Sequence, residues 1–275
     1  MKKRIFALFL SALLLVTVLC ACGDESQSEV GGTGSDGTST SGEAVTGGEL
    51  VVGISQDLGD SLDPYQMTAA GTREVLFNVY EGLVKPTSTG EYVPAVASDS
   101  TVSEDGLTYT FPLREGVLFH NGEEVTTDDV IYSFETCAET TVDTALAAAL
   151  SAVESVTADG NTITVTLSEA NPDFLSYVGM VYIVPDDYTD QATAPVGTGP
   201  FRFVSRSVQQ NLVMEKFADY WGEGASLDKV TFQIFEDSNA LMSALSAESV
   251  DMAVHLTIDQ VNTIGEGTYK TLEGT

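Results

Sequence analysis

The residues that could do chemistry are few and scattered along this sequence. The two histidines, His120 and His255, lie far apart, and none of the patterns H-E-x-x-H, G-x-S-x-G or C-x-x-C occurs. The segment Ser226–Lys229 matches S-x-x-K, the acylation motif of penicillin-interacting serine enzymes. That chemistry also needs Ser-Asp-Asn and Lys-Thr-Gly elements, which the sequence lacks. We therefore predict no catalytic residue, although a glycosidase-like pair among the 41 acids stays open.

Two further segments have features that could indicate a metal or a phosphate site. His120 belongs to the turn Phe119–Gly122, where an imidazole that stabilises the turn is favoured over a metal ligand. The glycine-rich segment Pro195–Phe201 has no G-x-G-x-x-G pattern and no Walker lysine, and Pro200 lacks the N–H that a phosphate cradle would use. It predicts an extended crossing with close backbone approach, and no metal or cofactor is expected.

The pattern of apolar residues predicts an α/β protein. Expected strands, each bounded by turn residues and with period-2 alternation in the longer ones, lie at 49–54, 107–113, 162–167, 201–206, 211–217, 230–234 and 250–254. Helices are expected at 72–80, from Thr126 with Val130, Ile131 and Phe134 buried, at 140–152, and after Asp237 with Ala240, Leu241, Ala244 and Leu245 buried. Turns are expected at Ser103–Gly106 and at Asn121–Gly122.

Composition limits the partners. The 275 residues include 41 acidic and 11 basic side chains, a net charge of −30. Such a surface is soluble and argues against binding to nucleic acid, whose phosphates attract basic surfaces. Cys137 is predicted to be a small buried hydrophobe rather than a reactive thiol.

The N-terminus has the form of an export signal. Lys2, Lys3 and Arg4 precede the apolar run Ile5–Leu19, and Leu19–Cys22 resembles a bacterial lipobox. We predict a lipoprotein signal peptide over 1–21, lipidation of Cys22 and a flexible tether over 22–48, rich in Gly, Ser and Thr. An ordinary signal peptide cleaved near Ala21 and an uncleaved anchor are the alternatives.

Several ordered motifs carry a resemblance to one family. They are Leu62-Asp63-Pro64, Glu81–Val84, the run SEDGLTYTFPLREGVLFHNG with VTTDDVIYSF (103–134), Pro195–Phe201, Tyr220-Trp221-Gly222 and Val250-Asp251-Met252. In this order the chain resembles the family 5 extracytoplasmic solute-binding proteins, which are oligopeptide, dipeptide and nickel receptors of ABC importers. The resemblance covers about residues 49–256; the motif before Tyr220 lacks the family's usual proline.

The resemblance implies a two-lobe periplasmic-binding-protein-like fold of the family 5 type that captures its solute by hinge closure. The first lobe would comprise 49–90 and 196–275, with an inserted α/β subdomain at 91–195. The implied function is an extracytoplasmic substrate-binding lipoprotein, held on the cell membrane by its lipid anchor. It would be monomeric and non-enzymatic, and would deliver an oligopeptide or similar small solute to ABC permease subunits. A nickel-chelate or sugar receptor, a lipid-anchored enzyme, and a surface lipoprotein that binds a signalling peptide without uptake remain alternatives.

The ligand-facing residues follow from the resemblance alone. The loop after Leu62-Asp63-Pro64 and the loop after Val250-Asp251-Met252 face the ligand in the family. In this sequence they correspond to Met67, Thr68, Ala69, Gly71, His255, Leu256 and Thr257. Family members are much longer than this chain, so we expect the second large lobe to be missing and solute binding by the 275 residues alone to be weak.

Overall fold

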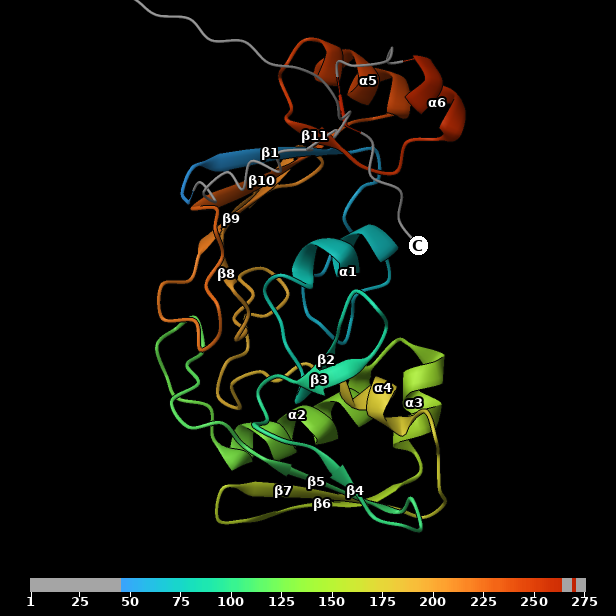
Figure 1. The fold of residues 1–275 in the computed structure, drawn as a ribbon, viewed down its shortest axis with the longest axis vertical. Helices are drawn as coiled ribbons and strands as arrows, with labels where there is room; N and C mark the ends of the chain where they lie inside the picture. The colour runs from blue at the N-terminus through green and yellow to red at the C-terminus, as the bar shows by residue number, and fades with distance from the viewer. Residues whose placement is uncertain (1–45, 264–268, 271–275) are drawn as a thin grey trace, which may run out of the picture. The chain divides into compact units, whose positions relative to one another are not determined.

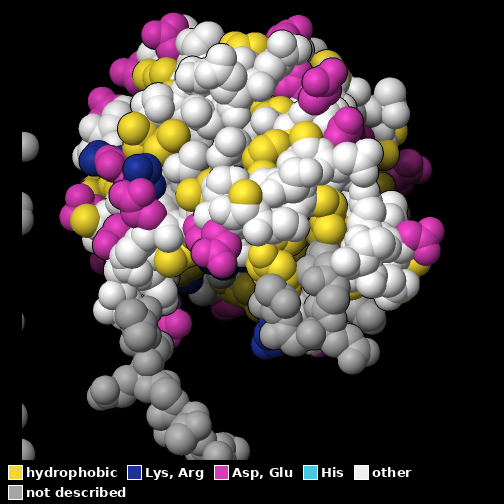
Figure 2. Space-filling view, turned by 90° about the horizontal axis from the view of Figure 1, so that it is seen from above, with side chains coloured by type: hydrophobic (Ala, Val, Ile, Leu, Met, Phe, Trp, Pro, Cys, Tyr) yellow, Lys and Arg dark blue, Asp and Glu magenta, His cyan; other side chains and the backbone are white. Residues whose placement is uncertain are grey.

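The computed structural model describes residues 46–263 and 269–270. The predicted signal peptide, the lipidation site Cys22 and most of the predicted tether lie outside these residues. At the start of the described residues, Gly47 N–H donates to Ser226 O at 2.6 Å and Gly48 N–H to Asp228 Oδ2 at 2.9 Å. Figure 2 shows one face of the molecule, where Asp and Glu side chains recur widely and Lys and Arg are sparse.

A five-stranded sheet is assembled from segments far apart in the sequence (Figure 1). Its order is β11-β1-β10-β9-β8, and β1 is parallel to both of its neighbours. The strands are β1 (Glu49–Ile54), β8 (Phe201–Ser207), β9 (Asn211–Lys216), β10 (Lys229–Ile234) and β11 (Met252–Ala253). Both neighbours of β1, the strands β10 and β11, therefore come from the second half of the sequence.

A second, antiparallel sheet comes from one contiguous part of the chain. Its order is β4-β5-β7-β6, and the strands are β4 (Thr101–Val102), β5 (Thr108–Pro112), β6 (Val153–Asp159) and β7 (Thr162–Leu167). The predicted alternation is confirmed, because Tyr109, Phe111, Ile163, Val165 and Leu167 are all buried. A separate pair joins β2 (Val84–Pro86) and β3 (Tyr92–Pro94).

Three of the described helices begin at an acid or a threonine whose side chain caps them. Thr126 and Asp129 form a reciprocal capping box at the start of α2 (Thr127–Thr140), which packs on β6 and β7. Asp143 caps α3 (Thr144–Leu150), and Asp237 caps α5 (Ser238–Ser246). The remaining helices are α1 (Ala70–Leu76), α4 (Phe174–Val178) and α6 (Ile258–Thr263).

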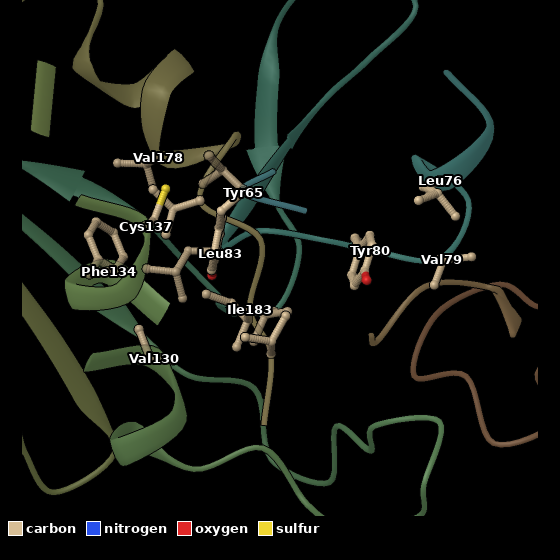
Figure 3. Close-up of a cluster of buried hydrophobic side chains, with 14 of the residues drawn as sticks. Tyr65, Leu76, Val79, Tyr80, Leu83, Val130, Phe134, Cys137, Val178 and Ile183 are labelled. Carbon is tan, nitrogen blue, oxygen red and sulfur yellow. The ribbon is translucent and has the colours of Figure 1, made fainter. Parts of the chain in front are cut away.

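The main core gathers side chains from all of these segments. In Figure 3, Phe134 and Cys137 of α2 lie near Leu83 and Val178, while Leu76 and Val79 lie at the other end of the same cluster. The Cys137 side chain is fully buried, and burial raises the pKa of its thiol to about 12, so it packs as a hydrophobe as predicted.

Several sequence-based predictions were wrong in their details. The helix expected at 72–80 starts at Ala70 and ends at Leu76. Beyond it, Val79 N–H donates to Leu76 O, three residues back, as in the tighter turn of a 3₁₀-helix. The helix expected at 140–152 is split between α2 and α3, because Asp143 starts a new helix. Ala240 is exposed rather than buried; Leu241 and Leu245 of α5 are buried in a second small core, and Ala244 is partly buried against it. Ile131 of α2 is also only partly buried.

Candidate functional site

A hollow of about 660 Å³ opens over α1. Its lining residues are Thr68, Ala69, Ala70, Arg73, Glu74, Phe77 and Tyr182. Arg73 and Phe77 are one turn apart and share a face. The Phe77 side chain is 50 % exposed and offers apolar surface to the hollow. The hollow thus combines an apolar wall with two charged groups, which is the usual make-up of a small-molecule site.

The two charges of the hollow are held by different parts of the chain. Arg73 Nη1 lies 3.1 Å from Asp143 Oδ2, the cap of α3. The backbone N–H of Leu146 and the Arg73 guanidinium lower the pKa of Asp143 below its ordinary value. Glu74 Oε2 lies 2.6 Å from His255 Nε2, in the loop after β11. Consecutive residues of α1 therefore present opposite charges.

A second cavity of about 240 Å³ lies between α1 and the five-stranded sheet. Its walls are mainly apolar, with Val52, Ile54, Val75 and Phe232 among them. Glu74 lines both cavities.

The loop that precedes α1 is fixed from the sheet. Arg206 of β8 donates through Nη2 to Leu58 O at 3.0 Å and to Gly59 O at 2.7 Å. Gly59 N–H in turn donates to Thr72 Oγ1 at 2.7 Å. These hydrogen bonds hold the loop at Leu58 and Gly59 between β8 and α1.

The structure places the predicted ligand-facing residues in three different settings. Thr68 and Ala69 line the hollow, and Gly71 and His255 line the second cavity. Met67 is 2 % exposed and belongs to the main core.

Two others support the chain around them. Leu256 packs against the small core of Leu241, Leu245 and Val250. Thr257 exchanges hydrogen bonds with Gln260 at the start of α6.

Sequence reasoning missed the side chains that give the hollow its character. Arg73, Glu74 and Phe77 lie in a helix that was predicted, but only its buried stripe was considered. Tyr182 comes from a distant apolar stretch. The available signal was Arg73 itself, because basic residues are rare in this chain.

The glycine-rich crossing contacts both the chain that follows α1 and the turn that contains His120. The crossing Pro195–Phe201 runs against the chain after α1: Gly199 N–H donates to Val79 O at 2.9 Å and Phe201 N–H to Asn78 O at 3.1 Å. His120 Nε2 contacts Gly199 O at 2.9 Å. The close approach predicted for this crossing is confirmed. The His120 imidazole, predicted to stabilise its own turn, is instead hydrogen-bonded to the crossing at Gly197 and Gly199.

Residues 91–274 match the family model of bacterial extracellular solute-binding proteins, family 5 middle region. The chain belongs to family 5 of the bacterial extracellular solute-binding proteins. The family 5 fold is also found by comparison with solved structures. The peptide-bound periplasmic binding protein DppA of Helicobacter pylori is similar with a TM-score of 0.73 and 29 % identity, over 80 % of this chain and 49 % of that one.

Curated relatives of this family 5 chain are binding proteins. It is 30 % identical to the nickel-binding periplasmic protein of Escherichia coli (strain K12), over 63 % of this chain and 35 % of that protein. It is 33 % identical to heme-binding protein A of Haemophilus influenzae, over 63 % of this chain and 38 % of that protein. The chain thus spans well under half the length of these relatives.

Within the described residues, no group of three or more His, Cys, Asp or Glu side chains could hold a metal ion. No helix of residues 46–263 is both long and apolar enough to cross a membrane.

Proposed function

We propose that this chain is part of the extracytoplasmic substrate-binding protein of an ABC importer, that it captures peptides, and that it delivers them to permease subunits in the membrane. The observation that carries the proposal is the hollow over α1, where Phe77 and Tyr182 offer apolar surface beside the opposite charges of Arg73 and Glu74. A zwitterionic peptide presents the same combination of charged groups and apolar side chains. The peptide-bound relative supports this choice of solute.

The arrangement of the sheets supports a division of the chain into a lobe and an inserted subdomain. We propose that 49–90 and 196–275 form the first lobe, because the five-stranded sheet joins Glu49–Ile54 to strands after residue 200. The segment 91–195 would be an inserted subdomain, because it contributes the whole of the four-stranded sheet. Of the ligand-facing candidates, Thr68, Ala69, Gly71 and His255 retain that role in this proposal.

The N-terminal part of the proposal concerns anchoring. Lipidation of Cys22 would hold a monomeric receptor on the outer side of the cell membrane through the tether. Intact mass of the native protein tests this: loss of residues 1–21 and a diacylglycerol on Cys22 are expected. An unmodified Cys22 would contradict the anchor and leave solute capture untouched.

Calorimetric titration of the full chain tests solute capture. A tetrapeptide with free termini should bind saturably and weakly, with a dissociation constant of about 1 mM. Arg73→Gln should weaken binding several-fold, because Arg73 is the only positively charged side chain among the described residues that line the hollow. Val208→Ala, at an exposed position beyond β8, serves as the matched control. Binding of nickel–histidine or of a sugar in place of the peptide would favour the alternative family 5 functions.

A further inference from the structure

A smaller cavity of about 150 Å³ adjoins the hollow over α1. The two share Phe77 and Tyr182 as lining residues, so the smaller cavity lies directly beside the proposed solute site. We call it the aromatic pocket, since its side walls include Phe77, Tyr80, Tyr92, Tyr182 and Tyr220, together with Met180.

The polar groups of the aromatic pocket satisfy one another. The Glu81 side chain is only 5 % exposed, and its Oε1 accepts hydrogen bonds from Lys85 Nζ at 2.8 Å and from Tyr220 OH at 2.7 Å. Its Oε2 accepts a hydrogen bond from Trp221 Nε1 at 2.7 Å. The Tyr80 hydroxyl bonds to Gln191 Oε1 at 2.9 Å. An entering charged group would have to displace these bonds.

The charges at the pocket also cancel. Lys85 neutralises Glu81, and its ammonium lies 5.7 Å from the centre of the Tyr220 ring and 4.9 Å from that of Trp221. Burial, followed by the Glu81 charge, raises the pKa of Tyr220 well above its ordinary value, so this phenol stays neutral. The space that is left favours a neutral occupant.

The size and the walls of the pocket select an aromatic ring. A cavity of about 150 Å³ with apolar walls holds one benzene-sized molecule. Rings at the wall favour tilted contact with another ring, as Tyr80 and Tyr182 already make with centroids 5.7 Å apart. Met180 has an unbranched, adaptable side chain that can adjust to a ring.

We propose that the aromatic pocket binds a neutral aromatic side chain of the captured solute, such as the phenyl ring of a phenylalanine residue. This inference rests on the proposed function for the identity of the solute, and it names the side chain that the site prefers. It makes Phe77, Met180 and Tyr182 specificity-determining residues.

The test uses two matched neutral probes, N-acetylphenylalanine amide and N-acetylalanine amide, titrated into the full chain. Trp221 is the single tryptophan of the chain, its ring centroid lies 5.2 Å from that of Tyr220, and its fluorescence reports occupancy. The phenylalanine probe should bind at least tenfold more tightly than the alanine probe, because the ring buries additional apolar surface. A ratio near one would overturn the inference.

Variants localise the effect. Met180→Trp fills the pocket and should bring the ratio of the two affinities close to one; because it adds a second tryptophan, its affinities are measured by calorimetry. Phe77→Ser removes an exposed wall residue and should reduce the ratio without a loss of core packing. Val208→Ala, far along the sequence on an exposed surface, should keep the wild-type ratio. A wild-type ratio in both pocket variants would overturn the inference.

A second pair of solutes separates this inference from the proposed function. Tetrapeptides that differ only by Phe or Ala at one position are compared in the same titration. If both bind with equal affinity at every position, the inference is overturned and the proposed function stands. If neither binds while the phenylalanine amide still does, the proposed function fails and the pocket stands as an aromatic-binding site.

Discussion

The Trp221 Nε1–H donates to the buried Glu81 carboxylate at a distance of 2.7 Å, although the two residues are 140 positions apart. Glu81 follows the turn after α1, and Trp221 follows β9. The Glu81 carboxylate therefore links the segment that follows α1 to the segment that follows β9. Lys85 and Tyr220 donate hydrogen bonds to the same carboxylate. Glu81 is therefore the shared acceptor of a buried polar network.

Glu81→Gln should lower the free energy of unfolding by about 2 kcal/mol, because it removes the charge that neutralises Lys85 and weakens three hydrogen bonds. Urea unfolding followed by circular dichroism measures the change. Glu215→Gln is the matched control: its ion pair with Arg202 is exposed on both sides and should be worth less than about 1 kcal/mol. Equal losses in the two variants would show that the network contributes nothing beyond a surface pair.

Gly199→Ala should destabilise the protein by about 3 kcal/mol or more. An added Cβ would lie 2.5 Å from Asn78 O and 2.8 Å from the carbonyl carbon of Val79, and both neighbours are backbone atoms that cannot turn aside. Gly224→Ala is the control, because its Cβ would meet only the flexible end of Lys216 at 3.4 Å. Thermal unfolding of the two variants checks the difference, and a Gly199→Ala protein as stable as the control would contradict the close crossing.

Asp143 has two tasks that can be separated by substitution. Its Oδ1 caps α3 by accepting bonds from Ala145 N–H and Leu146 N–H, and its Oδ2 pairs with Arg73. Asp143→Ala should cost about 1 kcal/mol of stability through loss of the cap. Asp143→Asn should keep the cap but release Arg73, which would then bind a solute carboxylate more strongly. Chemical unfolding measures the first effect and calorimetry with an acidic tetrapeptide the second; an equal loss of stability in the Asn and Ala variants would refute the separation.

The strands were largely predictable, and the site was not. Glu49–Ile54, a short apolar run, and Thr162–Leu167, an alternating one, have the predicted bounds. Helix ends were harder: α1 ends at Leu76, although the apolar residues Val79 and Tyr80 that follow are also buried.

The site depends on pairings over long distances. Arg73 and Asp143 are 70 positions apart, and Glu74 and His255 are 181 positions apart. The family resemblance led to Thr68, Ala69, Gly71 and His255, but Phe77 and Tyr182 become neighbours only through the tertiary fold. A sequence pattern records which residues are apolar, and it does not record which of them stay half-exposed beside a cavity.

The pH dependence of stability should carry a signature of His120. Burial lowers the pKa of His120 from 6.5 to about 4, and the ring is held as a neutral group: Nε2–H donates to Gly199 O while Nδ1 accepts from Gly197 N–H at 3.3 Å. A proton added at Nδ1 would face that N–H and remove the bond.

Between pH 6.5 and about 4 the unfolded chain therefore binds a proton at His120 that the folded chain does not. Stability is complete above pH 6.5 and falls as the pH is lowered through this window, with a limiting slope of about 1.4 kcal/mol per pH unit. His120→Gln is less stable at pH 7 because the crossing is held less firmly, but it should lack this slope. Urea unfolding of both proteins at intervals from pH 7 to about pH 5.5 measures the difference, above the range in which most carboxylates titrate. Parallel curves for the two proteins would show that His120 is protonated as readily in the folded chain as in the unfolded chain.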